Sequence, residues 1–235
     1  MLNFEILNEL TLKVTCTGND VLFAKAGAFI GGESPGGRNY NFEKLLLGPQ
    51  SNFGDALLGS LVRRVTGENL PLMKVTMSGN SVTYYANYGQ HVVVYKLAMG
   101  EVVSVESENL LAFTPDCNYS TRFIGSGVIS QKGLFTSTLT GNGPNAFVAL
   151  LSDGNPLVLS NIQNSSCITV DPDAVICWFS RNGYGDPQIR TDISWKNFIG
   201  QHSGESYMFE WSGGMPVSVL IQPSERRGGI KVGID

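Results

Sequence analysis

The sequence contains little charge, and this shortage argues against several classes of partner. Only 15% of its 235 residues are Asp, Glu, Lys or Arg, and the formal net charge is −4; roughly 25% charged residues is usual for soluble domains. A general nucleic-acid-binding surface needs clustered Lys and Arg that neutralise phosphates. The composition therefore argues against nucleic acid as a partner and favours a surface that contacts other subunits.

Histidine is also scarce, and the usual cofactor motifs are absent. The two histidines, His91 and His202, have no second His or Cys at ligand spacing beside them, which leaves no usual zinc or iron site to assemble. We expect His91 to be a structural strand residue and His202 an exposed loop residue. No phosphate-loop or dinucleotide-binding glycine motif occurs. The sequence thus predicts no cofactor, no metal site and no catalytic residue, and it identifies no binding residue.

Long apolar runs and paired cysteines are missing as well. No stretch approaches 18 apolar residues, so no membrane span is predicted. The opening MLNFEILNEL carries acids where a targeting leader would carry bases. The cysteines show no C-x-x-C spacing, and we expect them to be buried reduced thiols in a cytoplasmic protein. They are Cys16, Cys117, Cys167 and Cys177.

Short strand-like segments make up most of the chain. They are rich in Val, Ile, Thr and aromatic residues and are broken by Gly, Asn, Asp and Ser, which predicts an all-β sandwich or barrel-like fold. Examples are 10–17, 82–88, 91–97, 146–151, 167–179 and 217–222. One segment differs, because its apolar residues between Phe53 and Val65 have the 3.6-residue spacing of an amphipathic helix. A shorter helix is predicted at 192–198.

Internal repetition is the main organising feature. Residues 105–113 (VESENLLAF) align without a gap on 170–178 (VDPDAVICW), and 23–30 (FAKAGAFI) is a looser copy. A second marker aligns 68–86 on 132–150, and a third copy of it begins at Gly204. We therefore predict a single domain of three tandem β repeats, at about 1–88, 89–152 and 153–235.

The offsets between the markers locate two insertions. From the first repeat to the second, the first marker shifts by 82 residues (105 − 23) and the second by 64 (132 − 68). About 18 extra residues therefore lie within 31–67, where the predicted helix falls, and about 8 lie between Phe179 and Gly204. Insertions that break the repetition, such as 31–67, are the places where a site is expected. The flexible-looking GGESPGGR at 31–38 is interpreted as a surface loop that leads into this insertion.

Two weaker motifs have competing interpretations. GESPG at 32–36 matches the G-x-S-x-G nucleophile elbow, but Ser34 lacks the helix that must follow it, so a catalytic role is not predicted. The acid pairs Glu106 with Glu108 and Asp171 with Asp173 would each share one face of an extended chain and could then bind a hard cation. The alternative is a solvated turn or strand edge, which suits acids that flank Ser107 and Pro172.

The chain resembles a known family nearly end to end. The segments that carry the resemblance are 24–32 (AKAGAFIGG), 59–70 (GSLVRRVTGENL), 100–114 (GEVVSVESENLLAFT) and 168–179 (ITVDPDAVICWF). They resemble the altered-inheritance-of-mitochondria twenty-four family. The resemblance implies three β repeats similar to the tryptophan RNA-binding attenuation protein, arranged as a pseudo-threefold sandwich or double-stranded β-helix. It implies no catalytic residues.

Three functions follow from these observations. The first is a non-enzymatic binding or assembly protein that associates with itself or with a protein or small-molecule partner. The second is RNA binding, which rests on the implied fold alone and is opposed by the charge. The third is a carboxylate-dependent enzyme that acts on a small molecule.

Overall fold

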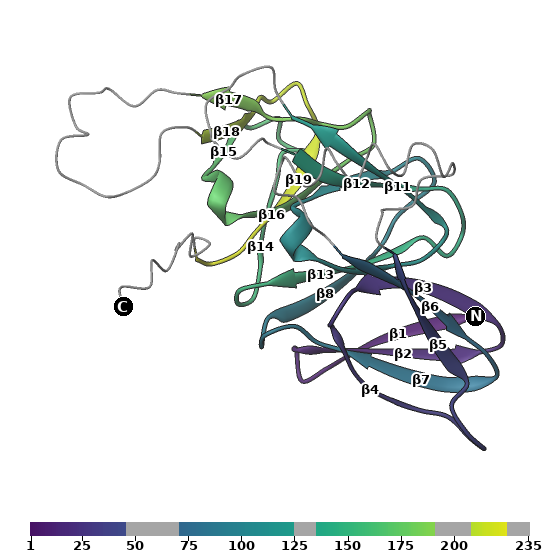
Figure 1. Cartoon of the computed structure of the whole chain (residues 1–235). Helices are drawn as coiled ribbons and strands as arrows, with labels where there is room; N and C mark the ends of the chain where they lie inside the picture. The colour runs from purple at the N-terminus through teal and green to yellow at the C-terminus, as the bar shows by residue number, and fades with distance from the viewer. Residues whose placement is uncertain (46–70, 125–134, 191–207, 225–235) are drawn as a thin grey trace, which may run out of the picture.

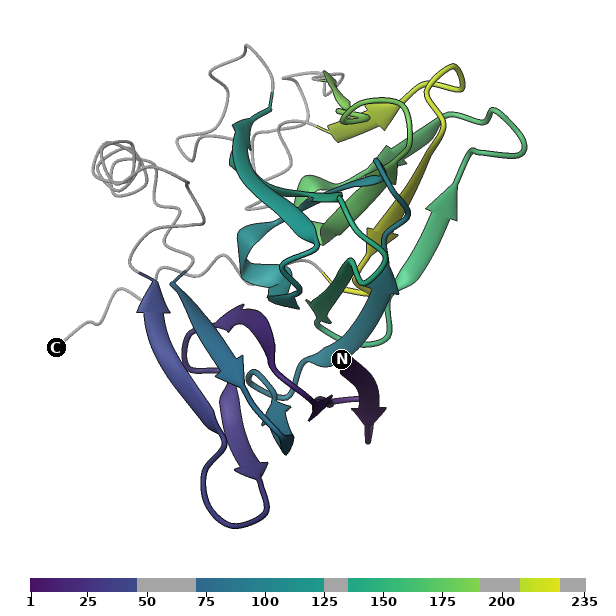
Figure 2. The same ribbon diagram turned by 90° about the vertical axis from the view of Figure 1, so that its right-hand side faces the viewer.

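The computed structural model describes residues 1–45, 71–124, 135–190 and 208–224, and this part of the chain is all β. It forms four antiparallel sheets, none of them closed, and two single-turn 3-10 helices, η1 (Ser107–Asn109) and η2 (Pro172–Ala174). The all-β prediction is therefore confirmed. The N-terminal strands lie at one end of the molecule and the C-terminal strands at the other (Figures 1 and 2). Within the described ranges, no helix is long and apolar enough to cross a membrane.

Sheets A and B contain the described strands of residues 2–96 and two later strands. The order in sheet A is β1 (Leu2–Leu7), β2 (Thr11–Thr17), β7 (Asn80–Tyr85) and β4 (Phe29–Glu33). The order in sheet B is β5 (Tyr40–Leu45), β6 (Leu72–Met77), β3 (Asp20–Lys25), β10 (Leu110–Phe113), β13 (Phe147–Ser152) and β8 (His91–Lys96).

Sheets C and D contain the remaining described strands. The order in sheet C is β11 (Cys117–Phe123), β12 (Phe135–Gly141), β9 (Val102–Val105), β16 (Val175–Ser180), β19 (Val217–Ile221) and β14 (Leu157–Ser160). The order in sheet D is β15 (Ile168–Val170), β18 (Met208–Trp211) and β17 (Gln188–Arg190).

The strand orders of the sheets are related by a constant shift. Adding six to each strand number of sheet B (5, 6, 3, 10, 13, 8) gives the order of sheet C (11, 12, 9, 16, 19, 14). The same shift takes β4, β7 and β2 of sheet A to β10, β13 and β8, which are half of sheet B. It also takes β11, β12 and β9 to the three strands of sheet D. Sheets A and D therefore each correspond to one half of a six-stranded sheet, with β1 added at the edge of sheet A.

Alternating side chains explain why these segments form strands. In β2, Leu12, Val14 and Cys16 are fully buried while the residues between them are half-buried, as expected when successive side chains point to opposite faces. The buried residues form three clusters along the molecule. Strands β9 and β10, inside the six-stranded sheets, are buried at every position, which is typical of strands covered on both faces.

One predicted strand is divided in the structure. The segment 167–179 forms β15 and β16, separated by η2. Pro172 lies in the first turn of η2, where its missing N–H costs no ladder hydrogen bond. The two predicted helices, at 53–65 and 192–198, lie outside the described residues.

Candidate functional site

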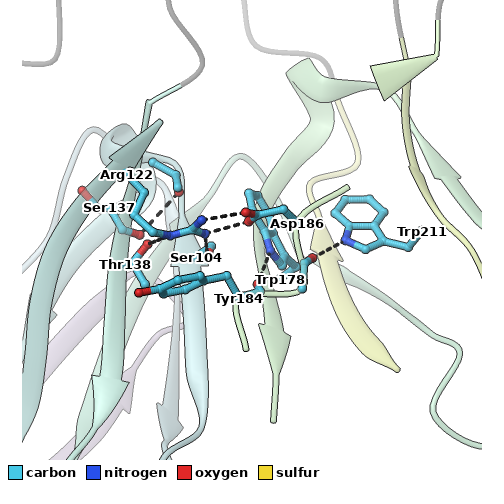
Figure 3. A network of polar contacts seen from close by, with 10 residues as sticks. Ser104, Arg122, Ser137, Thr138, Trp178, Tyr184, Asp186 and Trp211 are labelled. Carbon is cyan, nitrogen blue, oxygen red and sulfur yellow. Dashed lines mark hydrogen bonds and ion pairs between the residues drawn. The ribbon is translucent and has the colours of Figure 1, made fainter. Parts of the chain in front are cut away.

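A network of polar side chains joins sheet C to the loop that follows β16 (Figure 3). Arg122 in β11 donates two hydrogen bonds to Asp186, from Nη1 to Oδ2 at 2.6 Å and from Nη2 to Oδ1 at 2.7 Å. The Arg122 side chain is only 15% exposed and that of Asp186 is 35% exposed. This paired geometry is the strongest that arginine makes with a carboxylate.

The other edges of the guanidinium are also occupied. Arg122 Nε donates to Thr138 Oγ1 and Nη2 donates to Ser104 Oγ, both at 3.1 Å. The ring of Tyr184 lies against the guanidinium, 3.7 Å from Cζ to the ring centroid, within the range of a cation–π contact. Ser104 and Thr138 are cross-strand partners in β9 and β12. The strand register therefore brings both hydroxyls to one face, where Arg122 reaches them diagonally from β11.

Two tryptophans hold the loop that supplies Asp186 and Tyr184. Trp178 Nε1 donates to the carbonyl of Tyr184 at 3.0 Å, and Trp211 Nε1 donates to the carbonyl of Gly185 at 2.8 Å. Both indoles are fully buried. Gly185 has a φ of 62°, a conformation that favours glycine. The indoles of β16 and β18 thus hold the loop by its backbone carbonyls, and Arg122 holds it by the Asp186 side chain (Figure 3).

The chemistry of this network is that of a structural clamp. The carboxylate of Asp186 neutralises the guanidinium, and the neighbouring hydroxyls of Ser104 and Thr138 accept hydrogen bonds from it. Beside it, the Ser137 hydroxyl contacts Ser107 Oγ at 3.0 Å and Tyr119 Oη at 3.1 Å. Nothing in this arrangement pairs a nucleophile with a base, which is one of the common ways to activate a nucleophile for covalent catalysis.

The sequence contains no local signal for this network. Arg122 and Asp186 are 64 residues apart, and their contact depends on how sheet C is assembled. The glycines around Tyr184 predict a turn, but nothing in the sequence identifies the arginine that the turn meets.

Ser34 lies just after β4, in a turn and not in a nucleophile elbow. Its Oγ donates to the carbonyl of Gly37 and accepts from the Asn39 amide at 3.0 Å. Ser34 and Glu33 line a pocket of about 480 Å³ beside the end of sheet A. His91 is in β8, as predicted, and its Nδ1 is 3.9 Å from a Glu9 carboxylate oxygen. His202 lies outside the described residues.

The acid pairs occupy turns. Glu106 and Asp171 precede η1 and η2, and Glu108 and Asp173 lie in the first turns of those helices. The Asp171 carboxylate accepts a hydrogen bond from the Asp173 amide at 2.8 Å. The extended conformation that would place each pair on one face is therefore wrong, and the turn alternative is confirmed. Within the described ranges, no three His, Cys, Asp or Glu residues gather as a metal site would require.

The four cysteines are free thiols, but one of them contradicts the sequence prediction. Cys16, Cys117 and Cys177 are buried, whereas Cys167 is exposed, because it precedes the short edge strand β15. Burial raises the pKa of Cys117 to about 11 and that of Cys177 well above its ordinary value. Cys117 and Cys177 should therefore be unreactive, since the thiolate is the reactive form, and burial keeps reagents away from Cys16 as well.

We expect a thiol reagent to modify one cysteine rapidly in the folded protein and the other three only after unfolding. The measurement is the time course of thiol labelling at mildly alkaline pH, with and without denaturant. A Cys167→Ser variant is the control, and it should lack the rapid phase. Two rapidly reacting thiols in the folded parent would contradict the described burial.

Comparisons with known proteins agree with the fold. The crystal structure of protein SPYM3_0169 from Streptococcus pyogenes matches with a TM-score of 0.68 over 96% of this chain and 94% of that chain. The two sequences are 17% identical, so the likeness concerns the fold alone. A comparison with curated proteins finds no match. The family model for mitochondrial biogenesis AIM24 matches residues 4–224, in agreement with the resemblance in the sequence, and the chain therefore belongs to the AIM24 family.

Proposed function

We propose that the chain is a non-enzymatic binding and assembly protein built from three tandem β repeats, similar in arrangement to the tryptophan RNA-binding attenuation protein. The observation that carries this proposal is the constant shift of six between strand orders. After β1, the strands divide into β2–β7, β8–β13 and β14–β19, and these sets fall within 1–88, 89–152 and 153–235. Each set contributes its third, sixth and first strands to one sheet and its fourth, fifth and second strands to the next.

Irregularities in the strands support the same division. The register shifts between Phe29 and Gly31 in β4, between Leu110 and Ala112 in β10, and between Val175 and Cys177 in β16. These are the third strands of the three sets, and a bulge is a specific structural feature of a strand. The pairing favours Ala24 as the counterpart of Val105, because Ala24 lies opposite Ala112 as Val105 lies opposite Cys177. That is one residue beyond the Phe23 expected from sequence.

The way in which neighbouring repeats join favours assembly as the function. Sheets B and C are each completed only where one repeat meets the next, through the pairs β3 with β10 and β9 with β16. Repeats of this kind bury a continuous core by stacking on their neighbours. The low charge of the chain is consistent with further surface that contacts another subunit.

Sedimentation velocity over a wide range of protein concentration tests this function. We expect the sedimentation coefficient to rise with concentration, or a stable species larger than the 25.4 kDa chain. Affinity capture with the tagged chain is the companion measurement. A monomer at every concentration that also retains no partner would argue against assembly.

A further inference from the structure

The two ends of the molecule carry complementary unpaired strand edges. In sheets B and C, the second strand of one repeat pairs with the third strand of the next, as β3 does with β10 and β9 with β16. At the N-terminal end, the third strand of the first repeat is β4, and at the C-terminal end, the second strand of the third repeat is β15. Within the described residues, each of these two strands pairs on one side only. Figure 1 shows β4 and β15 at opposite ends of the molecule.

The exposure of one isoleucine marks the unpaired edge of β4. Ile30 occupies the bulge of β4, as Leu111 and Ile176 occupy the bulges of β10 and β16. Leu111 and Ile176 are fully buried, whereas Ile30 is 59% exposed.

The buried counterparts of Ile30 each enter the core of the preceding repeat. Leu111 packs in the cluster that contains Leu12 and Val75, and Ile176 packs in the cluster that contains Val103 and Leu139. Ile30 has the residue type and the position for such a contact, but no repeat precedes it in its own chain.

We propose that β4 of one copy pairs with β15 of a second copy, so that sheets A and D join into one continuous antiparallel sheet. This inference rests on the proposed assembly function and names its interface and its partner. Ile30 then packs on the cluster that contains Ile168, Val170, Phe209 and Trp211. This is the core cluster of the third repeat, and it is equivalent to the clusters of the first and second repeats that receive Leu111 and Ile176. The contact is heterologous, so further copies add at each end or the chain of copies closes into a ring.

The two strand pairs that join neighbouring repeats within the chain, β3 with β10 and β9 with β16, are called internal joints, and they set the register expected for this contact. In sheet C, Val105 lies opposite Cys177 and Val102 lies opposite Ser180. Val170 is the counterpart of Val105 in the third repeat. Gly31 is the counterpart of Cys177, because each residue directly follows the bulge of its strand, Gly31 in β4 and Cys177 in β16. The joint therefore places Val170 opposite Gly31 of the second copy and, three residues away, Cys167 opposite Ser34.

Neither strand contains lysine or proline, two residues that commonly block an edge from pairing. Edge strands are commonly blocked by Lys, by Pro or by inward-pointing charge. Strand β4 reads FIGGE, with one acid at its end, and β15 reads ITV with no charge. Gly32 is two residues after the bulge of β4, the position that Phe113 holds in β10 and Trp178 holds in β16. A Cβ at Gly32 would lie 2.8 Å from the Tyr40 ring, so in β4 the Tyr40 ring occupies the space that the larger side chains occupy in the other two strands.

A disulfide between copies tests the register directly. Ser34→Cys places a thiol opposite the natural exposed Cys167, while the other three cysteines are buried. Under mild oxidation, we expect non-reducing electrophoresis to show dimers and larger species. Mass spectrometry of differently labelled copies should identify a disulfide between the introduced thiol at position 34 of one copy and Cys167 of another. The Ser34→Cys, Cys167→Ser double variant is the control and should remain uncrosslinked.

A second variant tests the same interface without altering the Ser34 turn. Ile30→Glu should weaken self-association by at least about tenfold in the dissociation constant, because it replaces a large apolar side chain at the joint with a charge. Met99→Glu introduces the same charge at a 71% exposed methionine in the turn before β9 and should leave association unchanged.

The outcomes separate this interface from the proposed function. If the parent associates but the Ser34→Cys variant gives no link and Ile30→Glu associates normally, the interface is wrong and assembly still stands. A disulfide that forms only within single chains would show that β4 and β15 of the same copy pair with each other. That result would also overturn the pairing of β4 with a second copy. A parent that is monomeric and retains no partner overturns both.

Discussion

Replacement of Arg122 by alanine is expected to lower the free energy of unfolding by about 2 to 3 kcal/mol. The substitution removes two hydrogen bonds to Asp186 and one each to Thr138 and Ser104. It also removes the contact with the Tyr184 ring and leaves Asp186 without its ion-pair partner. Because the Asp186 side chain is 35% exposed, water can solvate it in part, which keeps the loss at or below the lower end of the roughly 3 to 5 kcal/mol lost when a buried pair is broken.

Urea unfolding measures this loss, with tryptophan fluorescence as the signal because Trp178 and Trp211 donate to the loop beside Asp186. Lys13→Ala is the matched control: it removes an ion pair to Glu5 whose two side chains are 29% and 51% exposed. Such a pair contributes under about 1 kcal/mol. Arg122→Lys keeps the charge but loses the two-pronged geometry, and its loss should lie between those of the other variants. A loss for Arg122→Ala no larger than that for Lys13→Ala would contradict the clamp.

The parts of the fold that could be predicted are those that local chemistry determines. The predicted strands at 10–17, 91–97 and 217–222 agree with β2, β8 and β19 to within a residue or so at each end, because period-two patterns and turn residues act over a few positions. A turn was one of the interpretations of the acid pairs that flank Ser107 and Pro172, and 3-10 helices occur at both places. These features need no knowledge of distant residues.

The candidate site could not be predicted in the same way. Arg122 contacts residues of β9, β12 and the loop after β16, and this neighbourhood exists only after sheet C has formed from distant segments. Strand-to-strand hydrogen bonds are made by backbone groups that all residues except proline carry in full, so a local sequence pattern that predicts a strand does not identify its partner strand. For the same reason, the sequence did not indicate that β4 and β15 lie at the ends of half-sheets.

Alanine at Ile176 and alanine at Ile30 should have sharply different effects, although the two residues occupy equivalent bulges. Ile176 is fully buried in a cluster formed by residues of sheets B and C, and Ile176→Ala is expected to lower the free energy of unfolding by about 3 kcal/mol through lost apolar contact and the cavity left behind. Ile30 is 59% exposed in a single copy, so Ile30→Ala should change that free energy by less than about 0.5 kcal/mol under conditions where the protein is monomeric.

The contrast becomes informative when the protein concentration is raised. If Ile30 is buried at a joint between copies, the midpoint of unfolding of the parent should rise with concentration, since association stabilises the folded state by mass action. In Ile30→Ala this dependence should be smaller, while Ile176→Ala should keep it at a lower overall stability. Urea titrations at a low and a high protein concentration measure both effects. An equal concentration dependence in the parent and in Ile30→Ala would place the contact between copies elsewhere on the molecule, because the substitution removes most of the apolar side chain that the joint would bury.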